Sequence, residues 1–199
     1  MTRAAAQLAP TAADALIIVD VQNDFLPGGH LAVRDGDAVI PVLNRYVTSF
    51  VAANAPIFAT RDWHPADHCS FRGQGGPWPP HCIANTPGAA FAAGLSLPAG
   101  TRVISKATHP EKDAYSGFEG TDLAEYLRDL GVRRVFVGGL ATDYCVLNTV
   151  KDALAAGFEV ILLTDAIRAV NVQPDDGERA LAEMARAGAH AATLAEVGA

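Results

Sequence analysis

Short apolar runs alternate with amphipathic segments along most of this chain. Continuous apolar runs predict buried strands at 15–19, 57–60, 103–105, 134–137 and 159–163, with a further strand within 189–194. Helical spacing of apolar residues predicts helices at 38–53, 123–130, 146–156 and 175–187. Apolar strands that alternate with helices are typical of a parallel sheet covered on both faces. We therefore expect an α/β fold with three layers, α/β/α, around a mostly parallel sheet of about six strands.

The bulk composition is that of one globular domain. The chain has 199 residues, 50% hydrophobic and 19% charged, so it can bury a sizeable core. We expect residues 1–13, which are Ala-rich and lack an apolar run, to form a flexible N-terminal leader before a single domain at 14–199. The net charge of -7 argues against nucleic-acid and anionic-membrane partners, and no apolar run reaches the roughly 20 residues that span a bilayer. The odd number of cysteines favours a reducing compartment such as the cytoplasm.

Reactive polar residues lie at or just past the ends of four predicted strands. In chain order they are Asp20, Asp62 and His64, Lys106, and Cys145. Because ligands of parallel sheets bind beyond the carboxyl ends of the strands, we expect these side chains to converge on one edge. Each residue also has a structural explanation, such as a turn cap for Asp20 or a solvated charge for Lys106. Their shared position favours a functional site.

Cys145 falls in the first turn of a predicted helix, directly after the strand 134–137 and a Gly-rich turn. Unpaired backbone N–H groups and the positive end of the helix dipole favour a thiolate at such a position. Since the thiolate is the nucleophilic form, the segment predicts an attacking cysteine with donors ready for an oxyanion. The alternative is a small apolar residue that fills a gap between strand and helix.

The irregular segment 61–98 concentrates potential metal ligands. Four Asp and His side chains could bind one ion: Asp62, His64, His68 and His81. These donor types suit zinc, iron or manganese, and a metal with open positions acidifies its bound water. Cys69 and Cys82 are rival ligands that would make a closed, structural zinc site. Spacing alone leaves a catalytic metal, a structural metal and no metal all open.

Several segments carry more specific motifs: Asp20–Phe25, Asp62–Pro65 with His68, Trp78–Cys82, Lys106, Asp113–Phe118 and Gly139–Val146. Together they resemble the motifs of nicotinamidases, which belong to the isochorismatase-like cysteine hydrolase superfamily. The resemblance runs over residues 15–194 and so implies an isochorismatase-like hydrolase fold. The Asp-x-His motif with Trp-Pro-Pro-His is the more specific part, because relatives without a metal lack it. Ala107 is a small departure, since many nicotinamidases have Gly there.

This resemblance implies hydrolysis of nicotinamide to nicotinate and ammonia in NAD salvage, and of pyrazinamide as well. Carried over by position, Cys145 is the nucleophile, Asp20 the acid/base and Lys106 the third member of the triad. One divalent metal ion (zinc, iron or manganese) would be bound by the four Asp and His side chains named above: Asp62, His64, His68 and His81.

The resemblance also implies an oxyanion hole, and the residue types favour an aromatic pocket. The family has a cis peptide at the position of Leu140–Ala141, which would aim the Ala141 N–H alongside the Cys145 N–H at one oxygen. Three aromatic side chains would form walls that stack on the substrate ring, with ordinary core packing as the alternative: Phe25, Trp78 and Tyr115.

Other functions compete with this interpretation. The nearest is another amidohydrolase of the superfamily, acting on a carbamoyl or ureido substrate, and the metal ligands count against it. The isochorismatase branch cleaves a vinyl ether without a cysteine nucleophile, so Cys145 argues against that branch. A metal-binding scaffold on a degenerate fold should have lost Asp20, Lys106 or Cys145. The sequence leaves open the metal, the roles of Cys69 and Cys82, and whether the chain forms a homo-oligomer.

Overall fold

A single sheet organises residues 8–198, which the computed structural model describes. Its six strands are all parallel and lie in the order β3-β2-β1-β4-β5-β6. The strands are β1 (Asp14–Val19), β2 (Ile57–Asp62), β3 (Arg102–Lys106), β4 (Arg134–Leu140), β5 (Glu159–Arg168) and β6 (His190–Ala192). The predicted parallel sheet is confirmed.

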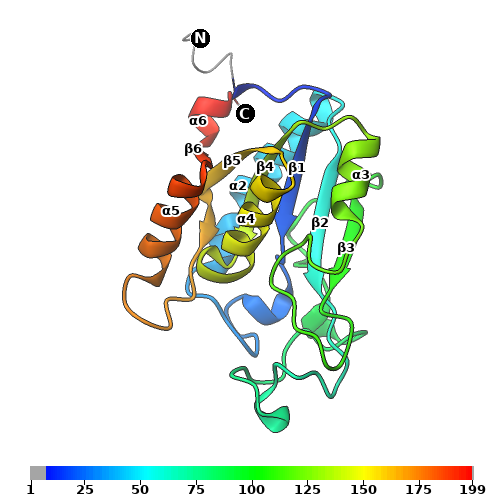
Figure 1. Cartoon of the computed structure of the whole chain (residues 1–199), viewed down its shortest axis with the longest axis vertical. Helices are drawn as coiled ribbons and strands as arrows, with labels where there is room; N and C mark the ends of the chain where they lie inside the picture. Colours follow the sequence, from blue (N-terminus) through cyan, green and yellow to red (C-terminus); the bar gives the residue numbers. More distant parts are fainter. Residues whose placement is uncertain (1–7, 199) are drawn as a thin grey trace.

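Helices cover both faces of this sheet (Figure 1). The α-helices are α2 (Val39–Ala52), α3 (Leu123–Asp129), α4 (Leu147–Ala155), α5 (Asp176–Ala187) and α6 (Leu194–Val197). One hydrophobic cluster joins α2 and α6 to one face, and a second joins α3, α4 and α5 to the other. The architecture is therefore the expected α/β/α sandwich. Within residues 8–198, no helix is long and apolar enough to cross a membrane.

Alternation along β1 explains the two layers. Leu16 and Ile18 enter the cluster on the α2 side, whereas Ile17 and Val19 enter the cluster on the α3–α5 side, and all four are fully buried. On α2, the buried residues recur at helical spacing: Val39, Leu43, Tyr46, Val47 and Phe50. Each such side chain contributes about 1.5–3 kcal/mol by leaving water. The amphipathic pattern over 38–53 therefore predicted this helix and its buried face correctly.

Four strands end later than their apolar runs suggest: β2, β3, β4 and β5. Asp62 and Lys106 are the last residues of β2 and β3 and pair with each other in register, rather than following their strands. β5 continues past the predicted end at Leu163 because a register shift in β4 brings Ile167 opposite Gly139. These polar strand ends are stabilised by ladder hydrogen bonds that an apolar pattern does not report.

The long segment 63–101 lies at the carboxyl ends of the strands, in the teal and green part of Figure 1. It contains two of the four 3-10 helices, which are η1 (Asn23–Phe25), η2 (Gly36–Ala38), η3 (Arg72–Gln74) and η4 (Pro87–Ala89). The buried Gln22 amide holds it in place: Nε2 donates to Asp62 O at 2.8 Å and to Ala89 O at 2.9 Å, and Oε1 accepts from Asp62 N. One side chain thus ties the segment to the end of β2.

Residues 1–7 of the expected leader lie outside the described part of the chain. The next residues contact the domain, because Leu8 packs against the hydrophobic core and Arg134 Nη2 donates to Ala9 O at 3.3 Å. Thr11 N donates to the Asp14 carboxylate at 2.7 Å. Residues 8–13 are therefore held against the start of β1.

Candidate active site

Lys106 lies buried at the centre of the reactive side chains. Its Nζ is 2.9 Å from Asp20 Oδ2 and 3.4 Å from Cys145 Sγ, and it forms a very short ion pair with Asp62. A fourth contact runs from Nζ to Ala114 O at 3.3 Å. The neighbouring strands β3, β2, β1 and β4 bring these residues together at one sheet edge. The structure thus places the predicted triad within one cluster.

Asp20 is fixed from the adjacent strand. Thr60 lies opposite Val19 in the β1–β2 ladder, and its Oγ1 donates to Asp20 Oδ1 at 2.6 Å. Asp20 has a left-handed backbone (φ 48°), a conformation that Asp tolerates better than most residues. One carboxylate oxygen therefore accepts from Thr60 while the other faces Lys106.

Cys145 lies in a π-helical turn, η5 (Thr142–Val146), between β4 and α4. The expected helical turn is present, but its first part is π rather than α. The Leu140–Ala141 peptide bond is cis, as the resemblance implies. Gly139 has φ 126°, and a Cβ there would lie 2.1 Å from Val19 O, so only glycine lets β4 pass β1 so closely before the turn.

Burial governs the protonation of the Cys145–Asp20 pair. Burial raises the pKa of the Cys145 thiol well above its usual range, although the Lys106 ammonium opposes this shift. Burial also raises the pKa of Asp20, although the Lys106 ammonium again opposes this shift. Lys106 thus favours the thiolate of Cys145, while burial acts in the opposite direction and is the larger effect.

The other two charges of the cluster stay ionised. Burial opposes the charge on Lys106, but Asp20 and Asp62 together raise the pKa of Lys106 well above its usual range. Burial also disfavours the Asp62 carboxylate, yet Lys106 and His64 lower the pKa of Asp62 below its usual range. Lys106 and Asp62 thus each stabilise the charge of the other, beside the Cys145–Asp20 pair.

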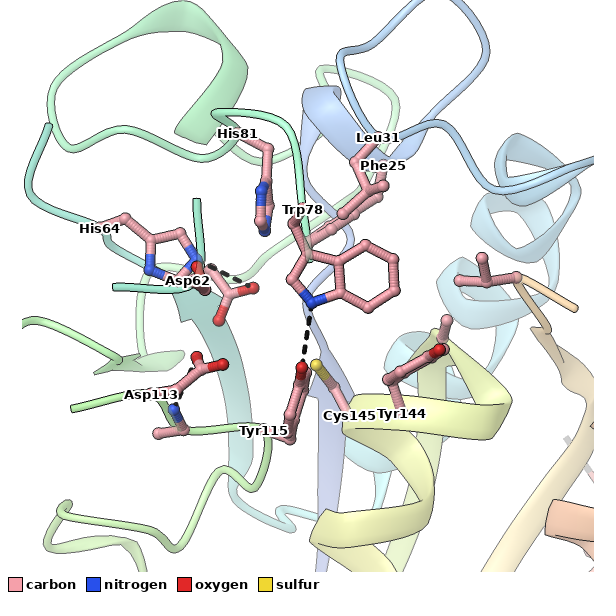
Figure 2. A pocket seen from close by; sticks show the side chains of 14 residues that line it. Phe25, Leu31, Asp62, His64, Trp78, His81, Asp113, Tyr115, Tyr144 and Cys145 are labelled. Carbon is pink, nitrogen blue, oxygen red and sulfur yellow. Dashed lines mark hydrogen bonds and ion pairs between the residues drawn. The ribbon is translucent and has the colours of Figure 1, made fainter. Parts of the chain in front are cut away.

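Three of the predicted metal ligands converge on one side of the pocket (Figure 2). Suitable ligand atoms of Asp62, His64 and His81 all lie within 4.8 Å of one another. His64 Nδ1 faces Ala107 O at 3.3 Å and His81 Nδ1 faces Pro79 O at 2.8 Å, so each Nδ1 carries the proton and each Nε2 has its lone pair free. His64 Nε2 is buried without a hydrogen-bond partner. This donor set fits a divalent metal such as zinc.

His68 is placed differently from the other three. Its ring lies 4.2 Å from the His64 ring, but both of its nitrogens have protein partners. Nδ1 accepts from Ser70 Oγ at 2.7 Å, and Nε2 donates to Lys112 O at 3.1 Å. Within residues 8–198 the set Asp62, His64 and His81 includes neither His68 nor any cysteine, and Cys82 packs in the hydrophobic core. The geometry therefore does not favour a closed Cys/His zinc site.

Aromatic side chains line much of the rest of the pocket (Figure 2). Trp78 Nε1 donates to Tyr115 Oη at 3.0 Å, and the Trp78 ring stands edge-on to Tyr144 at 5.1 Å. Phe25 lies beside His81 with ring centroids 5.6 Å apart. Burial raises the pKa of Tyr115 to about 12, so its hydroxyl stays protonated. All three predicted aromatic residues line the pocket.

Sequence reasoning missed several residues that shape this site. Thr60 and Gln22 position Asp20 and Asp62, and their signal was a polar residue inside a buried strand or motif. The sequence shows that Tyr144 precedes Cys145, but it does not show that the Tyr144 ring lines the pocket beside Trp78. Asp113, Leu31 and Val170 also line the pocket, and only Asp113 belongs to a motif quoted above.

Comparisons with known proteins show what the whole chain is similar to. The family model described as the isochorismatase domain matches residues 14–196. A nicotinamidase of Escherichia coli (strain K12) is 41% identical over 203 residues, which covers 92% of this chain and 95% of that protein. The crystal structure of the pyrazinamidase of Pyrococcus horikoshii in complex with zinc is similar, with 55% identity and a TM-score of 0.88 over 91% of this chain and 99% of that chain.

A second solved structure, of PnC1 from L. infantum in complex with nicotinate, is 40% identical with a TM-score of 0.87. That match covers 94% of this chain and 96% of the other. The family model covers residues 14–196 and so includes every residue of the pocket. The chain therefore belongs to the isochorismatase family.

Proposed function

We propose that this enzyme hydrolyses nicotinamide to nicotinate and ammonia, the reaction of NAD salvage, and pyrazinamide likewise. One observation carries the proposal: the Lys106–Asp20–Cys145 cluster and the Asp62, His64, His81 set share one aromatic-walled pocket. The nicotinamidase and pyrazinamidase relatives, and their complexes with zinc and nicotinate, support this substrate class. The chain is accordingly an amidohydrolase.

The first chemical step uses the Cys145 thiol and the Asp20 carboxylate. Asp20 accepts the thiol proton as Cys145 Sγ attacks the amide carbon, so the S–C bond forms while the carbonyl π electrons move to oxygen. Lys106 contacts both groups and offsets the negative charge that passes from one to the other. The Ala141 and Cys145 N–H groups are our candidates for donors to the oxyanion.

The second step releases ammonia and leaves a thioester. Protonated Asp20 returns its proton to the departing nitrogen as the C–N bond breaks. A water molecule then hydrolyses the thioester, with Asp20 again accepting a proton, and the thiol of Cys145 is restored. One acidic side chain thus alternates between base and acid, which its raised pKa suits.

The residues that would hold a divalent metal are Asp62, His64 and His81. His68, the fourth ligand that the resemblance implies, lies beside them with both ring nitrogens bonded within the protein. When bound, the metal supplies a Lewis acid for the ring nitrogen of the substrate and for a water molecule. Phe25, Trp78 and Tyr115 would bind the flat ring, since aromatic walls prefer such partners. The three cysteines are free, which supports our placement of the enzyme in the cytoplasm.

Ammonia release from nicotinamide by the purified, metal-loaded protein tests the proposal. We expect release by the parent and none above background by Cys145→Ala, with an unchanged circular dichroism spectrum. Cys69→Ala is the matched control, because Cys69 is a partly exposed thiol that does not line the pocket. Failure of the parent on nicotinamide, with turnover of a ureido or carbamoyl amide, would replace the substrate but keep the nucleophile.

A further inference from the structure

The nucleophile turn carries a carboxylate that the proposed chemistry does not use. Asp143 is partly buried and precedes Cys145 by two positions in η5. Its Oδ1 accepts from Val170 N at 2.9 Å and its Oδ2 accepts from Asn171 N at 2.8 Å. The two carboxylate oxygens thus hold two successive amides of the loop that follows β5.

That loop, residues 169–175, has a second attachment at the start of α5. Asn171 Oδ1 accepts from Gly177 N at 2.8 Å. A Cβ added at Gly177 would lie only 2.7 Å from Ala169 Cβ, so the two backbones approach closely there. The loop is therefore fixed to α5 by Asn171 and to the nucleophile turn by Asp143.

Val170 is the residue that connects this loop to the reaction. Its side chain lines the same pocket as Ala141, Tyr144 and Cys145, and it also packs against the hydrophobic core. Asp143 binds the Val170 amide, not its side chain. The carboxylate therefore sets the backbone position from which the isopropyl group reaches the pocket.

We propose that Asp143 is a positioning residue, which holds the Val170 amide so that the Val170 side chain forms an apolar wall for the substrate ring. The identity of that ring rests on the proposed function. A carboxylate suits this task because it has only acceptors and can offer one oxygen to each N–H. An asparagine would offer one oxygen and turn an NH₂ donor toward the other N–H.

The loss of these bonds should act on substrate binding more than on the chemical step. The nucleophile turn has its own support, since Ala141 O accepts from Tyr144 N at 3.1 Å and from Val146 N at 3.0 Å. The Val170 side chain is apolar and carries no charge or hydrogen-bonding group, so it stabilises the bound substrate and the transition state alike. Removal of such uniform binding raises KM and leaves kcat nearly unchanged.

The first experiment compares Asp143→Asn with the parent in steady-state kinetics on nicotinamide. We expect KM to rise about tenfold and kcat to stay within about threefold, which corresponds to one lost charge-assisted hydrogen bond. Asp176→Asn is the matched control: Asp176 Oδ2 accepts from Gln173 N at 2.7 Å in the same loop, but Asp176 does not line this pocket. KM of the control should be unchanged. A fall in kcat at constant KM in Asp143→Asn would overturn the proposal, since the carboxylate would then act on Cys145.

A double-mutant cycle separates positioning from general stability. Val170→Ala removes the wall itself, so the Asp143→Asn, Val170→Ala double variant should raise KM no more than the larger single change. If the two single changes raise KM by factors that multiply in the double variant, Asp143 does not act through Val170 and the proposal is contradicted.

Backbone amide hydrogen exchange supplies a readout that needs no turnover. Exchange at Val170 and Asn171 should be faster in Asp143→Asn and unchanged in Asp176→Asn. Unchanged exchange in Asp143→Asn would refute the anchoring. If the parent fails to hydrolyse nicotinamide, the proposed function is wrong, and exchange at Val170 alone decides whether Asp143 holds the loop.

Discussion

At the residue scale, one buried ammonium group makes the whole cluster possible. Lys106 contacts two carboxylates and the thiol in a region from which solvent is excluded. Without it, Asp20 and Asp62 would be buried charges with no cation beside them, and such charges are costly to desolvate. Lys106 thus stabilises the fold locally and sets the protonation of the reacting groups.

Lys106→Met should therefore abolish activity and lower the free energy of unfolding by about 3–5 kcal/mol, the cost of breaking a buried ion pair. Lys151→Met is the control, because Lys151 pairs with Glu183 while 45% exposed, and such surface pairs contribute about 0–1 kcal/mol. Urea denaturation monitored by tryptophan fluorescence measures both. Equal small losses in the two variants would contradict the role assigned to Lys106.

The raised pKa of Cys145 predicts how its thiol reacts with pH in the metal-free enzyme. Because the pKa of Cys145 lies above that of an ordinary cysteine, the thiolate fraction is small at pH 7 and grows about tenfold per pH unit. Iodoacetamide labelling of Cys145 should therefore accelerate steadily from pH 7 to about pH 9, as measured by peptide mass spectrometry. The partly exposed Cys69 reports reagent activity in the same sample. A rate that is already constant at neutral pH would show a stable thiolate instead.

At the element scale, the local pattern of apolar residues predicted most strands and helices, because the spacing of apolar residues within a short segment shows which side chains are buried. The apolar runs located every strand of the sheet, and the strand ends located Asp20, Lys106 and Cys145. The pattern could not show contacts between distant segments, such as Gln22 with Ala89, which are 67 positions apart. It also could not show that His68 uses both nitrogens within the protein, because its partner Lys112 lies on another loop.

The end of β3 offers a test of backbone strain. Ala107 has φ 50°, a left-handed conformation that costs a non-glycine residue about 1–2 kcal/mol. Ala107→Gly should raise the free energy of unfolding by up to about 1 kcal/mol after the greater entropy of unfolded glycine is counted. Ala90→Gly, at φ −70°, should lower it by about 0.4–1 kcal/mol. Urea denaturation measures whether each change raises or lowers the free energy of unfolding. Destabilisation by both changes would contradict the strain argument.

At the scale of the whole molecule, the site joins parts of the fold that no single element could bring together. The order β3-β2-β1-β4 places Lys106, Asp62, Asp20 and the turn before Cys145 side by side. The segment 63–101 then adds His64, Trp78 and His81 over the same edge. A ligand that binds Asp62, His64 and His81 together therefore crosslinks β2 to this long segment.

Metal removal should for this reason lower thermal stability as well as activity. A metal that binds only the folded state, at a free concentration 1,000 times its dissociation constant, adds about 4 kcal/mol to the free energy of unfolding. For a chain of this size that gain raises Tm by roughly 10 °C. Differential scanning fluorimetry with zinc and with a chelator measures the increment. His81→Ala should abolish this increment, since the set then loses a ligand whose Nε2 is free.

His68→Ala should lower Tm both with zinc and with the chelator, because the bonds to Ser70 and Lys112 are lost, yet it should keep the metal-dependent increment. Loss of the increment in His68→Ala would instead make His68 a ligand, and would mean that its ring turns away from Lys112 O when metal binds.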